Sequence, residues 1–362
     1  MKLKKLIFTE NSTLKKSYNL LLANIQWKIF KNSKVITYPA ALTICPGNIC
    51  NLSCSLCPTG QNDNGRGKGF LRLELFKKIM DECGPYLWNL DLYNWGEPLL
   101  NKELVEMVKY AKSFKVRVSI STNLNHFNNS ICSDLVLSGL DKIVVSLDGT
   151  SQESVSKYQV GNDFKKVVAN IKRLANCKKE LNKKTPIIAW RFLVNKYNEN
   201  EIGNAKKLSR EIGVDELKIN KFRCDMGKEL LLDNDKQFKN VSSWLPTNES
   251  LSLYDYAEKR KKKTKNCRWL WLQSSINWNG SVAPCCAVWH EKYDFGNIRD
   301  KSFKIIWNSA KYREARKISR KKNIKSTDNI CSICYANKSI IYNFTTTYFC
   351  YLCVLLTPPK ML

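Results

Sequence analysis

The chain has 362 residues, of which 43% are hydrophobic, so it is long and apolar enough to fold as one large α/β domain or as two unequal domains. Its first residues, MKLKKLIFTENS, lack the apolar run of a secretory signal, and no segment reaches the roughly 18 apolar residues that a membrane span requires. The net charge of +28 indicates either an anionic partner or a general abundance of lysine along the chain. The basic runs 259–265 and 316–325 are not accompanied by an aromatic-rich recognition motif, so specific nucleic-acid binding is the less favoured option.

Residues 14–30 predict an amphipathic helix, because apolar side chains recur there at helical spacing. The apolar stripe consists of Leu14, Tyr18, Leu21, Leu22, Ile25 and Ile29. Basic side chains on the other face are Lys15, Lys16 and Lys28. Such a helix either caps the next domain, which we favour, or lies on a membrane surface.

From residue 41 onward, short apolar runs alternate with segments of helical periodicity. The expected strands are 41–45, 87–95, 116–122, 142–148, 186–194 and 215–220. The expected helices are 71–83, 104–111, 130–138, 164–174 and 200–212. This alternation predicts a parallel sheet that closes into a partial barrel, with its site at the carboxyl ends of the strands. A polar, charged linker over 225–266 then precedes a smaller module that begins at Cys267.

Fifteen cysteines are more than an ordinary enzyme needs. A disulfide framework fits this chain poorly, because such frameworks belong to short secreted chains and this one is long, lysine-rich and without a signal. Thiolates that a cytosol keeps reduced, and that serve as metal ligands, are the better interpretation. We therefore expect a cytoplasmic metalloprotein.

Three of the thiols stand close together in the loop after the first expected strand. Cys50, Cys54 and Cys57 have the spacing C-x3-C-x2-C. A structural zinc site needs a fourth ligand, which Cys45 would have to supply because histidines are scarce. A four-iron cluster held by three thiolates instead keeps one iron open for a small molecule.

This spacing resembles the signature of radical S-adenosylmethionine (radical SAM) enzymes, C-x3-C-x-Φ-C, with Leu56 as the apolar residue. Three further family landmarks follow in order. Asn94-Trp95-Gly96-Glu97-Pro98 resembles the GGEP-type motif after the second strand, with Trp95 in place of the first glycine. Thr122-Asn123-Leu124 resembles the Thr-Asn-Gly of the third strand, and Ser146-Leu147-Asp148-Gly149 resembles the Ser-Leu-Asp-Gly of the fourth.

The resemblance implies a cofactor and a reaction. Cys50, Cys54 and Cys57 would hold a [4Fe–4S] cluster whose fourth iron binds S-adenosylmethionine, and reductive cleavage would give a 5′-deoxyadenosyl radical that abstracts hydrogen from a substrate. A one-electron donor such as flavodoxin or ferredoxin is implied as well. Cofactor contacts are expected from Gly96, Glu97, Pro98, Thr122, Asn123, Ser146, Asp148 and Arg191. Thr122 and Asn123 could instead serve only to form a turn. Arg191 could instead contact the substrate or lie on the surface. No general base is identified.

A second cysteine set lies near the C-terminus. Cys267 and Cys285 flank Gly280 with the spacing C-x12-G-x4-C, and Cys331 and Cys334 form a C-x2-C. Four thiolates suit a cluster or a zinc ion. The segments 277–286, 295–298 and 305–316 resemble the SPASM module or its shorter twitch form, which carries auxiliary [4Fe–4S] clusters.

The ligands of the full SPASM form are not all present. Because Ile340 interrupts the cysteine pattern of that form, we expect one auxiliary cluster. Cys350 and Cys353 remain open as extra ligands, although inert buried thiols are favoured.

The expected architecture is a partial (β/α)6 TIM-like barrel with a small C-terminal iron–sulfur domain. The expected parts are an extension 1–40, a barrel 41–224, a basic linker 225–266, an auxiliary-cluster domain 267–338 and an apolar tail 339–362. An auxiliary cluster that accepts a second electron favours the oxidation of a small polar molecule, such as a sugar or cyclitol. The alternatives are a peptide- or protein-modifying maturase, and a non-catalytic metal-binding module that holds RNA or a membrane.

Overall fold

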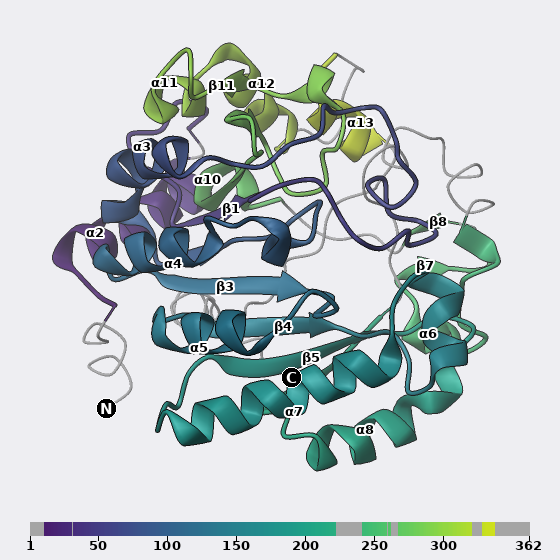
Figure 1. Cartoon of the computed structure of the whole chain (residues 1–362). Helices are drawn as coiled ribbons and strands as arrows, with labels where there is room; N and C mark the ends of the chain where they lie inside the picture. The colour runs from purple at the N-terminus through teal and green to yellow at the C-terminus, as the bar shows by residue number, and fades with distance from the viewer. Residues whose placement is uncertain are drawn as a thin grey trace, which may run out of the picture.

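The computed structural model describes residues 11–30, 32–221, 241–258, 260–261, 267–320 and 328–336. Within them, a nine-stranded sheet runs in the order β11-β10-β9-β1-β2-β3-β4-β5-β6 (Figure 1). The six expected strands all pair in parallel. They are β1 (Ala41–Ile44), β2 (Asn89–Asp91), β3 (Arg117–Thr122), β4 (Lys142–Ser146), β5 (Ile187–Leu193) and β6 (Glu216–Asn220). The predicted α/β partial barrel is confirmed.

Amphipathic helices connect the strands and cover one face of the sheet (Figure 1). They are α3 (Leu73–Cys83), α4 (Leu104–Ser113), α5 (Asn129–Leu137), α7 (Phe164–Glu180) and α8 (Ile202–Glu211). Helix α7 begins after Asp163, whose side chain accepts from the Lys166 N–H, and it buries Val167, Ile171 and Leu174 as the sequence predicts. The short helix α6 (Gln152–Tyr158) was not expected. It begins with a capping box at Ser151, a signal that the apolar pattern does not contain.

The two faces of the sheet differ in polarity. In β3, Val118 and Ile120 are fully buried against the helices, whereas Arg117, Ser119 and Ser121 are half-buried on the opposite face. Register pairing continues this polar face across the neighbouring strands, because Asp91 lies opposite Ser119 and corresponding pairs follow in β4 to β6. We call it the lumen face, since it lines the inside of the partial barrel.

Strands of the C-terminal module extend the barrel sheet. Strand β9 (Gln273–Ile276) pairs in parallel with β1, and β10 (Ser281–Ala283) and β11 (Gly296–Asn297) continue antiparallel from it. The remaining described helices of the module are α10 (Trp269–Leu272), α11 (Phe303–Trp307), α12 (Ala310–Ile318) and α13 (Ile330–Ala336). The first barrel strand is therefore an interior strand, and the cysteine loop that follows it lies between the two halves of the sheet.

The predicted N-terminal helix is present as α2 (Leu14–Ile25), followed by a π-helical turn, η1 (Gln26–Phe30). It packs at the amino ends of the barrel strands, as the Lys16 ammonium donates to the carbonyls of Phe114 and Lys115 just before β3. Its buried residues are Lys16, Asn19, Leu20, Ala23 and Asn24. The helix thus caps the barrel, but much of the expected apolar stripe faces solvent.

The basic runs lie largely outside the described residues. Where 316–325 is described, it is not a solvated patch: Arg316 is fully buried and donates to the carbonyls of Leu270 and Ser33, and Arg320 contacts the carbonyl of Trp27. The expected linker is described in part, with a small ladder of β7 (Tyr254–Asp255) and β8 (Arg260–Lys261). Cys350, Cys353 and the apolar tail 339–362 lie outside the described residues. No described helix has the length and hydropathy of a membrane span.

Candidate active site

The loop after β1 brings the three N-terminal thiols together. Cys54 lies within electrostatic range of Cys50 and Cys57. Burial raises the pKa of the Cys50 thiol to about 11 and raises the pKa of Cys54 as well, so bare thiolates are disfavoured and a compensating cation is required to hold them. Among the described residues, no three His, Cys, Asp or Glu side chains are placed so that they could bind one metal ion together. A cluster does not require that arrangement, because each of its iron atoms takes one thiolate.

The turn after β2 packs directly on this loop. A Cβ at Gly96 would lie 2.3 Å from the carbonyl oxygen of Gly47, so only glycine fits. The Glu97 N–H donates to the carbonyl of Ile49, and Pro98 begins the next short 3-10 turn. Trp95 is buried, and its indole N–H has no hydrogen-bond partner among the described residues. An unpartnered buried donor of this kind fits a site that receives a polar ligand.

Glu97 organises the turn after β3. Its carboxylate accepts from the Thr122 hydroxyl at 2.6 Å and from the Asn123 N–H at 2.8 Å, and burial raises its pKa to about 7. Asn123 in turn donates to the Cys50 sulfur at 3.7 Å and to Asn51 at 2.9 Å. Leu124, where the family pattern has glycine, adopts a left-handed backbone with φ of 57°, held by the Thr122 hydroxyl and by Asn170. The loop therefore keeps a conformation that favours glycine, at a cost of about 1–2 kcal/mol.

The remaining expected residues lie at the ends of β4 and β5. The Asp148 carboxylate accepts from the Leu193 N–H at 2.8 Å, and burial raises its pKa to about 6. Arg191 donates to the Ser146 hydroxyl on the lumen face. Asp148 thus fastens two strand ends beside the cysteine loop, and Ser146 and Arg191 point polar groups into the barrel.

The four C-terminal thiols also come together. Cys331 lies within electrostatic range of Cys285, Cys267 and Cys334. Burial raises the pKa of Cys285 and Cys331 well above the usual thiol range, which again requires a compensating cation. Three separate segments supply these thiols, namely the residues just before α10, the turn after β10 and α13.

Two family models match the chain over these regions. The model described as the radical SAM superfamily matches residues 44–192, and SPASM, an iron–sulfur cluster-binding domain, matches residues 267–335. The chain belongs to the radical SAM superfamily. As such an enzyme it uses S-adenosylmethionine and [4Fe–4S] clusters, and its C-terminal part is a SPASM module.

Two curated relatives cover most of this radical SAM enzyme. The tungsten-containing aldehyde ferredoxin oxidoreductase cofactor-modifying protein of Pyrococcus furiosus is 26% identical over 75% of this chain and 81% of its own length. The Fe-coproporphyrin III synthase of Methanosarcina barkeri is 24% identical over 79% of this chain and 78% of its own.

Solved structures share the fold. Streptococcus suis SuiB bound to its precursor peptide SuiA matches with a TM-score of 0.59 and 16% identity over 89% of this chain and 77% of that one. The anSMEcpe structure with bound AdoMet matches with a TM-score of 0.53 and 20% identity over 78% and 81%.

A set of contacts that the sequence did not predict joins the two cluster regions. Arg66, just after the cysteine loop, is fully buried and forms a bidentate pair with Asp294 of the SPASM module at 2.8 and 2.9 Å. Its Nε also donates to the carbonyl of Trp289. The Trp289 ring meets Trp95 edge-on, with centroids 5.2 Å apart. Trp95, the departure from the family glycine, is therefore a packing contact between barrel and module.

A second unpredicted group lies on the lumen face. Asp91 accepts from the Ser119 hydroxyl at 2.6 Å and from Tyr93. The Tyr93 hydroxyl lies within electrostatic range of Arg191 and of Cys286, the neighbour of Cys285. The only sequence pattern that could have indicated this group is the alternation of polar residues along β2 and β3. The same alternation is equally typical of a sheet face that is exposed to solvent.

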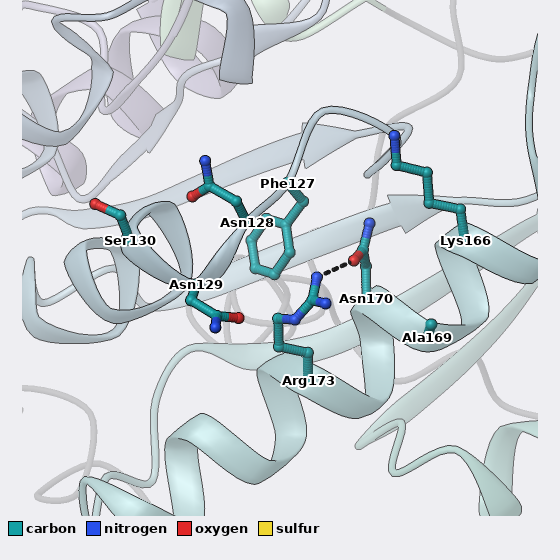
Figure 2. A pocket seen from close by; sticks show the side chains of 8 residues that line it. All are labelled: Phe127, Asn128, Asn129, Ser130, Lys166, Ala169, Asn170 and Arg173. Atoms are coloured by element: carbon teal, nitrogen blue, oxygen red, sulfur yellow. Dashed lines mark hydrogen bonds between the residues drawn. The ribbon is translucent and has the colours of Figure 1, made fainter.

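One open cavity of about 570 Å³ lies outside the barrel, between the start of α5 and α7 (Figure 2). Phe127, Lys166 and Arg173 line it, and the Arg173 guanidinium donates to Asn170. None of its lining residues is a cysteine or an expected cofactor contact, so it does not belong to the candidate active site.

Proposed function

We propose that this radical SAM enzyme oxidises a small polar molecule bound on the lumen face. The observation that carries the proposal is the hydrogen-bonded group of Asp91, Tyr93 and Ser119 on the lumen face, within electrostatic range of Arg191 and of Cys286, the neighbour of Cys285. A substrate held there would have hydrogen-bonding partners, a half-buried carboxylate and the C-terminal cysteine set nearby.

We assign the ligand roles by residue. Cys50, Cys54 and Cys57 would hold the cluster that binds S-adenosylmethionine, and Cys267, Cys285, Cys331 and Cys334 the auxiliary one. The two clusters and the cosubstrate supply a radical that removes a hydrogen atom from the substrate and an acceptor for the electron that an oxidation releases. The chain's own residues orient both substrates and take up the proton.

Asp91 is the residue that we propose as proton acceptor. Burial raises the pKa of its carboxyl to about 6, while the Ser119 and Tyr93 hydrogen bonds hold it down. A carboxyl with that pKa is largely ionised near neutral pH and is still basic enough to accept a proton, which is what a general base needs. Tyr93 donates to this carboxylate, which keeps the group oriented.

The charge of the lumen face favours an anionic substrate. Basic side chains outnumber acidic ones on this face. Lys142 and Lys218 both pair with Glu216, and Arg117 and Arg191 face a single further carboxylate, Asp91. Ser275, paired with β1 on the same face, is buried and its hydroxyl has no partner among the described residues. The name of one curated relative describes the modification of a cofactor, and the name of the other describes the synthesis of a porphyrin. These names support a cofactor precursor with acidic groups, rather than a peptide, as the substrate.

The proposal is tested with anaerobically reconstituted protein. It should be brown and carry about eight irons, as expected for two four-iron clusters, and it should form 5′-deoxyadenosine with reductant and S-adenosylmethionine. Incubation with fractionated polar metabolites should then increase 5′-deoxyadenosine and convert one anionic compound to a product two mass units lighter. Colourless protein with stoichiometric zinc, or stimulation by peptides alone, would contradict it.

Asp91→Asn should separate proton transfer from radical formation. We expect turnover of the stimulating fraction to fall about 10²–10⁴-fold, which is the usual contribution of a general base. Formation of 5′-deoxyadenosine without substrate should stay at the wild-type level, because the Asp91 carboxylate is hydrogen-bonded to Ser119 and Tyr93 on the lumen face. Ser121→Ala, on the same face of β3, is the matched control and should lose little. Equal losses in both variants would rule out a specific role for Asp91.

The wild-type pH profile gives a second check. A base with a pKa of about 6 must lose its proton to act, so turnover should rise with pH through about 6 and then level off. The stability of the fold should change in the opposite sense. The pKa of Asp91 in the folded state lies above the usual value of 3.8 for an aspartate carboxyl, so the folded state binds the proton more tightly. Asp91 therefore opposes folding increasingly as pH rises toward 6. Asp91→Asn should therefore not destabilise the protein at pH 8.

A further inference from the structure

Among the residues that the structure describes, most of the strongly exposed large apolar side chains lie near the N-terminus. Leu14, Tyr18, Leu21, Ile29, Phe30 and Ile36 are between 48% and 88% exposed. We call these six residues the N-terminal apolar face. Ile305, also exposed, adjoins it on α11, because the neighbouring Lys304 ammonium donates to the carbonyls of Ile36 and Thr37. A gathering of apolar groups of this kind marks a binding surface more often than scattered exposed residues do.

Polar contacts fix the direction of this face. The buried side of α2 carries the Lys16 ammonium, which donates to Phe114 and Lys115 at 2.8 and 2.7 Å, and Asn19, which exchanges two hydrogen bonds with Tyr38. A rotation of the helix that buried Leu14 and Tyr18 would leave these groups unpaired, which is strongly unfavourable. The outward orientation of the apolar face is therefore a stable feature of the fold.

The charge around the face is of one sign. Residues 11–40 contain no aspartate or glutamate, and Lys15 and Lys34 are exposed among the apolar side chains. An amphipathic helix with apolar side chains and flanking lysines matches a surface of anionic lipid, where the chains enter the headgroup boundary and the ammonium groups meet phosphates. The net charge of +28 acts in the same direction at long range.

We propose that the N-terminal apolar face docks this protein on a membrane that contains anionic lipids. The position of α2 agrees with this role. Because α2 lies at the amino ends of the barrel strands, the carboxyl ends, and with them the cysteine loop that follows β1, lie on the other side (Figure 1). A membrane at the amino ends would leave the mouth of the barrel open to water. The inference is independent of the proposed reaction.

The test uses the full chain and vesicles in co-sedimentation. The protein should bind vesicles of phosphatidylcholine with phosphatidylglycerol and not vesicles of phosphatidylcholine alone, and binding should weaken as salt rises. A triple variant, Leu14→Ser, Tyr18→Ser and Leu21→Ser, should lower vesicle partitioning at least about tenfold. Because all three side chains are exposed, the fold should be unchanged. The matched control is Leu137→Ser, Val160→Ser and Tyr197→Ser, which replaces apolar side chains exposed elsewhere.

Three results would overturn the proposal. The first is a wild-type protein that binds neither kind of vesicle, which would mean that the face is covered by another part of the chain or by a protein. The second is equal binding by the triple variant, which would reduce the interaction to bulk charge. The third is a wild-type dimer in light scattering that the triple variant separates without any vesicle binding, which would assign the face to self-association.

Discussion

Cys54→Ala is expected to lower 5′-deoxyadenosine formation at least about 100-fold, because we propose Cys54 as a cluster ligand and the loss of a ligand should exceed the 10–100-fold effect of losing a ligand's hydrogen-bonding partner. Cys54 lies in the loop after β1 and is grouped with Cys50 and Cys57. Two remaining thiolates cannot hold the cluster with a single open iron. The variant should retain about half of the wild-type iron, since the four C-terminal thiols are untouched.

The contrasting variant is Cys331→Ala, which removes one thiol of the C-terminal set. It should keep reductive cleavage of S-adenosylmethionine and stop substrate turnover. Cys177→Ala, on α7 and away from both sets, is the matched control and should leave iron content and cleavage unchanged. If Cys331→Ala left turnover intact, the auxiliary cluster would have no catalytic role.

Arg66→Met should lower the free energy of unfolding by about 3–5 kcal/mol, the usual result of removing one partner from a buried ion pair. The Arg66 side chain is fully buried and that of Asp294 nearly so. Burial already raises the pKa of Asp294 although Arg66 opposes that shift, so the variant would leave a carboxylate with no compensating charge. The loss should be larger at pH 8 than at pH 5, where the stranded carboxyl can take up a proton.

Denaturant unfolding checks this prediction. Lys109→Gln is the control, because its pair with Glu106 is exposed and should contribute no measurable stability. The double variant Arg66→Met, Asp294→Asn should recover part of the loss, since no unpaired charge remains. A single Arg66→Met as stable as the control would show that the contact does not hold the barrel and module together.

Sequence reasoning succeeded where the pattern is local. The strand and helix periods predicted the parallel sheet because apolar side chains must face the helices, and α7 illustrates this with Val167, Ile171 and Leu174 buried as expected. The spacing of the N-terminal cysteines predicted one thiol group because a loop of eight residues cannot keep Cys50 and Cys57 far apart. The C-terminal four come from separate segments, and their grouping was implied by the resemblance to the SPASM module. The turn motifs were recognisable for the same reason.

Sequence reasoning was incomplete where partners are distant in the chain. The apolar stripe predicted helix α2 but not which side of it is buried. That side is set by Lys16, whose ammonium donates to carbonyls about a hundred residues away in the chain. In the sequence Trp95 is only a departure from a family glycine, and its packing partner Trp289 is about 200 residues away in the chain. Asp91 and Tyr93 had no motif, as their setting depends on strand register and on the module near Cys286.

The sequence by itself therefore determined the class of the protein, since ligand spacing and side-chain periodicity are properties of neighbouring residues. Only the tertiary structure decided how the barrel and the SPASM module join, which polar groups line the lumen face and which side of α2 meets solvent. These depend on contacts between segments that are far apart in the chain. Their energies come from burial and hydrogen bonding that no local pattern contains.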